Sequence, residues 1–162
     1  MHIPIFDKHC FMEANMEVGM EANTIELLKE CSSGCKMAIE SIELVQGYVE
    51  DEKMKELLKA YRSKHEDLQE KICGLLSQYG KADEKPKAIA EWMSKLMIEM
   101  KMMLHKDEHQ AAKLMMDGCN MGIQSVSEYV NKYRDASPEA KEVAKELVKA
   151  EEDFMEEMKQ FV

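Results

Sequence analysis

Apolar residues recur at alternating intervals of three and four along most of the chain, the spacing that places them on one face of an α-helix. The clearest stripe begins after Asn23, where Asn23 and Glu26 have the spacing of a capping box. Its members are Leu28, Cys31, Cys35, Ala38, Ile42, Val45 and Val49. The pattern predicts a long first helix with one buried face.

Four more helices are predicted after this one. The second ends at Gly80, the third covers about 86–104 and the fourth about 108–134. The fifth has Ser137 as its N-cap and Pro138 as its first helical residue, and it runs nearly to the end of the chain. No segment alternates in the way that a half-buried strand does. Residues 1–22 lack a clear period, and we expect an arm or short helix that packs late or mediates assembly. The predicted fold class is all-α.

The two halves of the chain repeat each other. Residues 35–42 read CKMAIESI and residues 119–126 read CNMGIQSV, so Cys, Met, Ile and Ser match at an offset of 84. The second predicted helix maps onto the last at an offset of 86. The repeat predicts two similar helical hairpins, joined by a crossover over residues 80–107 that contains a helix of its own.

This organisation, with its CSSGC and DGCNMG segments, resembles the ferritin-like proteins, and among them the small bacterial ones of uncharacterised function. The resemblance covers about residues 23–162 and implies a ferritin-like four-helix-bundle domain that follows an arm of residues 1–22. Di-iron sites of that class use Glu-x-x-His on two helices. The residues three positions before the last three histidines are Arg62, Met102 and Lys106. We therefore expect neither a di-iron site nor an enzyme.

Two polar residues, His65 and Glu151, interrupt otherwise apolar stripes and are repeat partners. Cys35 and Cys119 lie about as far from their hairpin turns as His65 and Glu151 do, so all four are expected to converge near the centre of the bundle. Two thiolates, an imidazole and a carboxylate suit zinc first, and iron or copper less well. The alternative is a buried His65–Glu151 pair that satisfies itself, with the cysteines as small core residues.

Two further patterns have simpler explanations. His105, Glu108 and His109 match the H-x-x-E-H string of some zinc peptidases, but they fall at a predicted helix junction. The methionine-rich crossover suggests copper(I), although methionine on a helix is more often adaptable core or interface. Trp92, Ile98 and Met102 lie off the main stripe of the crossover helix and are expected to form a dimer surface.

Charge and cysteine content narrow the possible functions. The chain has 22 basic and 32 acidic residues, a net charge of −10, which disfavours binding to nucleic acid. It has no apolar run of ~18 residues to span a membrane, and five cysteines, an odd number that fits reduced thiols in the cytoplasm. The leading hypothesis is a non-catalytic metal-binding module for metal handling or stress. The alternative is a metal-free homodimeric interaction or regulatory bundle.

Overall fold

The computed structural model describes residues 8–82, 87–103 and 107–162. In these ranges the chain is helical and has no strand, so the all-α prediction is confirmed. The elements are α1 (Lys8–Gln46), α2 (Glu52–Gln78), α3 (Lys87–Lys101), α4 (Glu108–Lys132), α5 (Pro138–Met158) and the short 3-10 helix η1 (Lys159–Phe161). The predicted helices and turns after Asn23 correspond closely to these elements.

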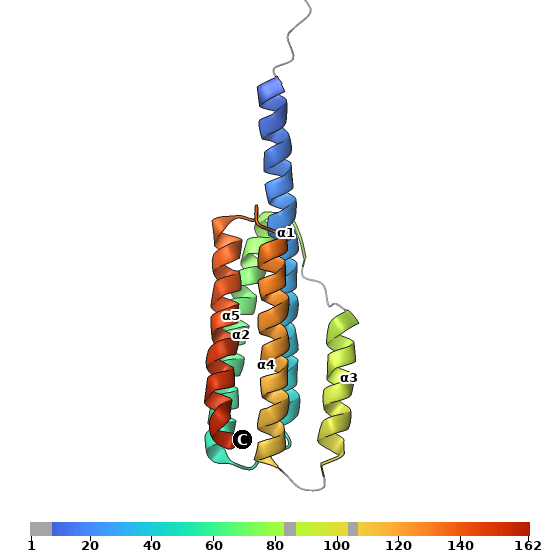
Figure 1. Cartoon of the computed structure of the whole chain (residues 1–162), viewed down its shortest axis with the longest axis vertical. Helices are drawn as coiled ribbons and strands as arrows, with labels where there is room; N and C mark the ends of the chain where they lie inside the picture. The colour runs from blue at the N-terminus through green and yellow to red at the C-terminus, as the bar shows by residue number, and fades with distance from the viewer. Residues whose placement is uncertain (1–7, 83–86, 104–106) are drawn as a thin grey trace, which may run out of the picture.

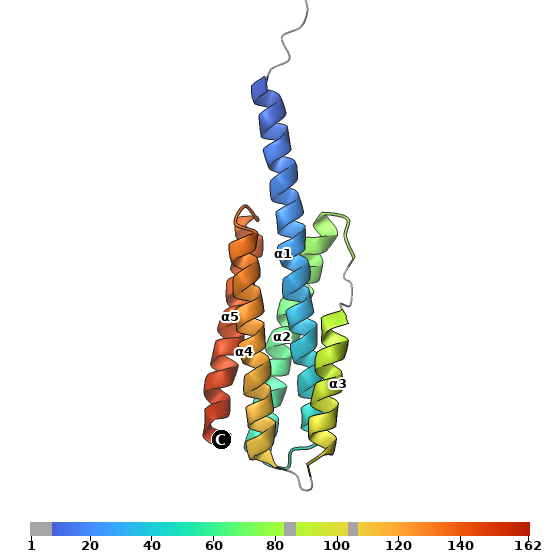
Figure 2. The same cartoon turned by 45° about the vertical axis from the view of Figure 1, so that its right-hand side comes forward.

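Four helices lie alongside one another and share a hydrophobic core (Figure 1). α1 packs on α2 and α4 packs on α5 as two hairpins, and the hairpins meet through contacts of α1 with α4 and α5 and of α2 with α5. We refer to these four helices as the bundle. α3 lies outside it, against α1 (Figure 2). The crossover thus carries the chain from the end of the bundle where α2 stops to the opposite end, where α4 begins (Figure 2).

The first helix differs from its prediction at its start. α1 spans Lys8–Gln46 and runs without a break through Asn23, so the predicted helix start at Asn23 is wrong. Residues 12–22 are mostly Met, Glu and Ala, which are good helix formers, and none of them is proline. Residues 8–22, here called the arm, project past the end of the bundle as a straight continuation of α1 (Figures 1 and 2).

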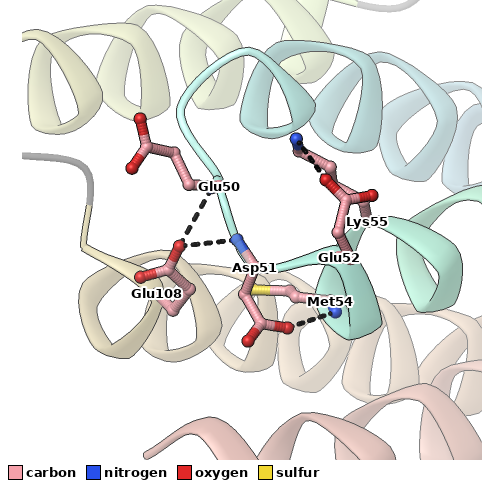
Figure 3. A network of polar contacts seen from close by, with 6 residues as sticks. All are labelled: Glu50, Asp51, Glu52, Met54, Lys55 and Glu108. Carbon is pink, nitrogen blue, oxygen red and sulfur yellow. Dashed lines mark hydrogen bonds and ion pairs between the residues drawn. The ribbon is translucent and has the colours of Figure 1, made fainter.

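Side-chain caps join the elements at the end of the bundle opposite the arm. Asp51 accepts a hydrogen bond from the backbone N of Met54 at 2.8 Å and so caps α2. Glu108 Oε1 accepts from the backbone N of Glu50 and of Asp51 at 2.9 and 3.0 Å (Figure 3). Glu108 therefore fixes the start of α4 against the α1–α2 turn. His105 of the H-x-x-E-H string lies outside the described residues.

At the other end, the α4–α5 turn is tied to α1. The backbone N of Ser137 donates to Thr24 Oγ1 at 2.8 Å, and the hydroxyl of Ser137 accepts from the backbone N of Ala140 at 3.2 Å. This confirms the predicted start of α5. Thr24 also marks the level at which the arm leaves the bundle. Gly80, which follows α2, has a φ of 66°, a conformation that favours glycine.

Trp92 docks α3 onto the bundle. Its side chain is only 5% exposed, and its Nε1 donates to Ser41 Oγ at 2.7 Å, while Ser41 donates to the carbonyl oxygen of Met37 at 2.6 Å. A Cβ at Gly118 would lie 3.1 Å from Trp92 Cζ2. The prediction that Trp92 belongs to a dimer surface is therefore wrong, because its ring is buried within the chain and fills the space beside this glycine.

Candidate functional site at the centre of the bundle

His65 and Glu151 meet inside the bundle. His65 lies on α2 and Glu151 on α5, and His65 Nε2 is 2.7 Å from Glu151 Oε1. His65 is fully buried and Glu151 is 5% exposed. The remaining buried residues of these two helices are apolar apart from the hydroxyl of Tyr61. The repeat positions that stand out in the sequence therefore contact each other directly.

The geometry assigns one proton to the space between the two side chains. His65 Nδ1 is 2.6 Å from the carbonyl oxygen of Tyr61, which can only accept, so Nδ1 carries a proton and donates it. Nε2 therefore shares a second proton with the Glu151 carboxylate. An imidazolium beside a carboxylate satisfies both groups without a net charge in the core.

Burial and pairing act on His65 in opposite directions. Burial is the largest single influence and lowers the pKa of His65, but the hydrogen bond and charge of Glu151 and the hydrogen bond to Tyr61 together raise the pKa above its ordinary value. The raised pKa favours the protonated imidazole. The pair is thus a charge-assisted contact between the two hairpins.

Cys119 on α4 adds a third polar group. Its thiol hydrogen-bonds to Glu151. Burial raises the pKa of Cys119, and the nearby Glu151 carboxylate raises it further. One turn later on the same helix, Gly122 packs beside Glu151, and a Cβ there would meet Glu151 Cδ at an ordinary contact distance of 3.5 Å. The thiol therefore stays protonated and donates, instead of acting as a nucleophile.

Cys35 occupies a neighbouring part of the core. It is fully buried in a cluster with Leu68 and Ile72, whereas Cys119 belongs to the cluster around Phe154. Cys31, one turn before Cys35, is also buried, and burial and the charge of Glu30 raise its pKa to about 12. The structure thus links His65, Glu151 and Cys119 directly. In the described part of the chain, no three His, Cys, Asp or Glu side chains are grouped to hold a metal ion.

A small cavity adjoins Glu151 on the side of α3. Its volume is about 20 Å³, which is room for one water molecule. Its polar wall consists of Ser41, Cys119, Trp92 and Glu151. Trp92 and Ser41 form a hydrogen bond with each other on one side of the cavity. Glu151 and Cys119 line its other side, so the cavity separates two polar clusters of the core.

Two contributors to the site do not emerge from the sequence reasoning above. The backbone carbonyl of Tyr61 is an acceptor one helical turn before His65, a partner that any buried helical histidine can reach. Gly122 lies on the apolar stripe of its helix and corresponds to Ala38 at the offset of 84. The small residue at both positions is the sequence feature that could have indicated close packing there.

Comparisons with protein-family models, with curated proteins and with solved structures found no match to this chain. Among the described residues, no helix combines the length and the apolar character that crossing a membrane requires.

Proposed function

We propose that this chain is a non-catalytic helical module that associates with a second copy of itself, and that the His65–Glu151 pair is an internal structural contact. The exposed arm is the observation that supports this proposal. Met12, Met16, Val18 and Met20 are between 44% and 68% exposed, and every residue from 12 to 22 is exposed. These side chains project beyond the bundle and leave their apolar area in water.

An arm of this kind gains stability from a partner. A lone helix of about 15 residues is marginal in water, and Gly19 in its interior costs about a further 1 kcal/mol relative to alanine. Met12, Met16 and Met20 are spaced four apart, so they form one stripe on the arm. Packing this stripe against another surface removes apolar area from water and holds the arm helical.

The state of the central site supports a structural role. The pair shares a proton across 2.7 Å, Cys119 donates to the same carboxylate, and raised pKa values keep Cys31 and Cys119 as thiols. Cys31, Cys35, Cys73 and Cys119 form no disulfide bond among the described residues, which suits a reducing compartment such as the cytoplasm.

A metal-binding role is the second candidate, favoured by the His65–Glu151 contact and by the small cavity beside it that Glu151 and Cys119 both line. Cys35 is the further ligand that this hypothesis names. Binding zinc, or less readily iron or copper, would release the shared proton and a thiol proton. Elemental analysis of protein purified without chelator tests this candidate. Near-stoichiometric metal that is lost in Cys119→Ala would support it.

Kinship with the ferritin-like proteins is likewise a proposal. It is supported by two helical hairpins, by a crossover that carries α3 along the outside, and by matched repeat positions at His65 and Glu151.

Sedimentation velocity over a range of protein concentrations tests self-association. We expect a dimer for the natural chain and a shift to monomer for the triple variant Met12→Gln, Met16→Gln, Met20→Gln. Met121→Gln is the matched control, since Met121 is 40% exposed on α4 away from the arm. A natural chain that sediments as a monomer up to high micromolar concentration would contradict the proposal.

A further inference from the structure

The outer surface between α4 and α5 carries an open groove. Its volume is about 620 Å³, and its apolar lining residues are Val130 from α4 and Ala144 and Val148 from α5. Lys145 and Lys149 stand along its α5 side. An apolar groove flanked by lysines is suited to an amphipathic helix with an acidic edge.

The arm has the complementary pattern. Met12, Met16 and Met20 form its apolar stripe, and the residue after each of them is a glutamate: Glu13, Glu17 and Glu21. On α5, Ala144 and Val148 are likewise spaced four apart, and the residue after each is a lysine, Lys145 and Lys149. In right-handed helices that pack antiparallel, the residue following each contact position lies on the same side of the interface in both helices. An antiparallel pairing therefore places glutamates beside lysines.

The arm and the groove also match in position and length. Thr24 and Ser137 bond to each other, so the arm leaves the bundle at the level of the α4–α5 turn (Figure 1). Met20 and Met12 lie ~6 and ~18 Å beyond that level at the usual helical rise. The groove residues of α5, from Glu142 to Glu152, lie ~8 to ~22 Å below it. Two copies that meet end to end thus bring each arm alongside the other's groove.

We infer that the arm of each copy lies antiparallel to α5 in the α4–α5 groove of a second copy, so that two arms are exchanged reciprocally in a symmetric dimer. The inference rests on the proposed self-association and specifies its geometry. The contact is between chains because α1 continues straight past its own bundle and carries the arm away from its own groove (Figures 1 and 2).

Charge selects the groove over a pairing of the two arms. Two arms packed antiparallel would bring rows of glutamates together on the same side, which is repulsive. The groove is also lined by Glu142, Glu146 and Glu152. Glu146 pairs with Lys71 at 2.8 Å, and Glu142 and Glu152 lie at the two ends of the α5 stretch, outside the levels of Lys145 and Lys149. Lys149 pairs with Asp153, and at 68% exposure its side chain has room to turn towards an arriving carboxylate.

A charge exchange tests this geometry. At the usual helical rise, Glu13 and Glu17 of the arm come opposite Lys149 and Lys145 of the groove. Glu13→Lys with Glu17→Lys, or Lys145→Glu with Lys149→Glu, therefore replaces two attractive contacts by repulsive ones. Exposed pairs contribute about 0.2–1 kcal/mol each, so we expect either double variant to weaken dimerisation about tenfold. Combining all four changes restores attraction, and we expect it to recover most of the affinity. Lys95→Glu with Lys101→Glu on α3 is the matched control and should leave dimerisation unchanged.

The outcomes separate this inference from the proposal on which it rests. A natural chain that is monomeric contradicts self-association itself. A dimer that is unaffected by either double variant, or that the four-fold exchange fails to rescue, overturns the arm–groove geometry alone. A dimer weakened by the α3 control and not by the α5 variant also overturns it, and assigns the arm to the face of α3 that carries Ile98 and Met102.

Discussion

His65 Nε2 lies 2.7 Å from Glu151 Oε1, although the two residues are 86 positions apart and lie on α2 and α5. An acid and a base thus meet in the core, one from each helical hairpin. Each side chain offsets the energetic cost of burying the other. Because one lies in each hairpin, the folded state of each hairpin stabilises that of the other.

Removing one member of the pair should cost much more than removing both. His65→Ala leaves Glu151 buried without its partner, and we expect a loss of about 3–5 kcal/mol in the free energy of unfolding. His65→Leu with Glu151→Met fills the space with apolar atoms and should cost far less, or nothing. Urea unfolding of both variants measures the difference. Equal losses in the two variants would rule out the buried pair as a coupled unit.

Stability should fall as the pH rises above neutral. Because the pKa of His65 is raised above its ordinary 6.5, its contribution is fully present below about pH 6.5 and is lost as the pH rises through the value in the folded chain. The slope for one proton is at most about 1.4 kcal/mol per pH unit. Unfolding free energies from pH 6 to 10 measure it, with the double variant His65→Leu, Glu151→Met as the reference. A parallel decline in both proteins would show that this pair is not the cause.

Gly118→Ala should loosen α3. The added methyl group would meet Trp92 Cζ2 at 3.1 Å, so we expect a loss of about 1–3 kcal/mol and a red-shifted emission from Trp92, the single tryptophan of the chain. Gly74→Ala on α2 is the control, because nothing lies within 4 Å of its added Cβ. That variant should gain about 0.5–1 kcal/mol from helix propensity. An unchanged Trp92 spectrum in Gly118→Ala would contradict the close contact.

The thiols should differ in their rates of alkylation. Cys31, Cys35 and Cys119 are buried, and the pKa values of Cys31 and Cys119 are raised, whereas Cys73 is half-buried. In a Cys10→Ser background, we expect Cys73 to react first with iodoacetamide at about pH 7.5 and the other three only on unfolding. Peptide mass mapping over time identifies the sites. Early labelling of Cys119 would show that the central site opens.

The sequence predicts the helices well because their buried faces follow from local spacing alone. It also singles out His65 and Glu151, because each is a polar residue on an otherwise apolar stripe. The arm is harder to predict, because Asn23 and Glu26 resemble a helix start and nothing in their spacing reveals that α1 continues through them.

The docking of α3 and the position of Cys35, the fourth of the predicted metal ligands, depend on tertiary packing. Trp92 lies on the same stripe of α3 as the buried Ile89, Leu96 and Met100, and its contacts with Gly118 and Ser41 hold α3 against the bundle. The place of Cys35 in the core depends on how α1 is rotated about its own axis against α2. The distance of a residue from its hairpin turn gives its height along the bundle but not this rotation.

Native mass spectrometry of protein purified without chelator tests the central claim most directly, because one spectrum reports both stoichiometry and bound metal. We predict a dimer of twice 18.7 kDa whose mass is that of the two polypeptides alone. A monomer that carries one metal ion per chain, with that ion lost in Cys119→Ala, would contradict the account and favour the metal-binding candidate.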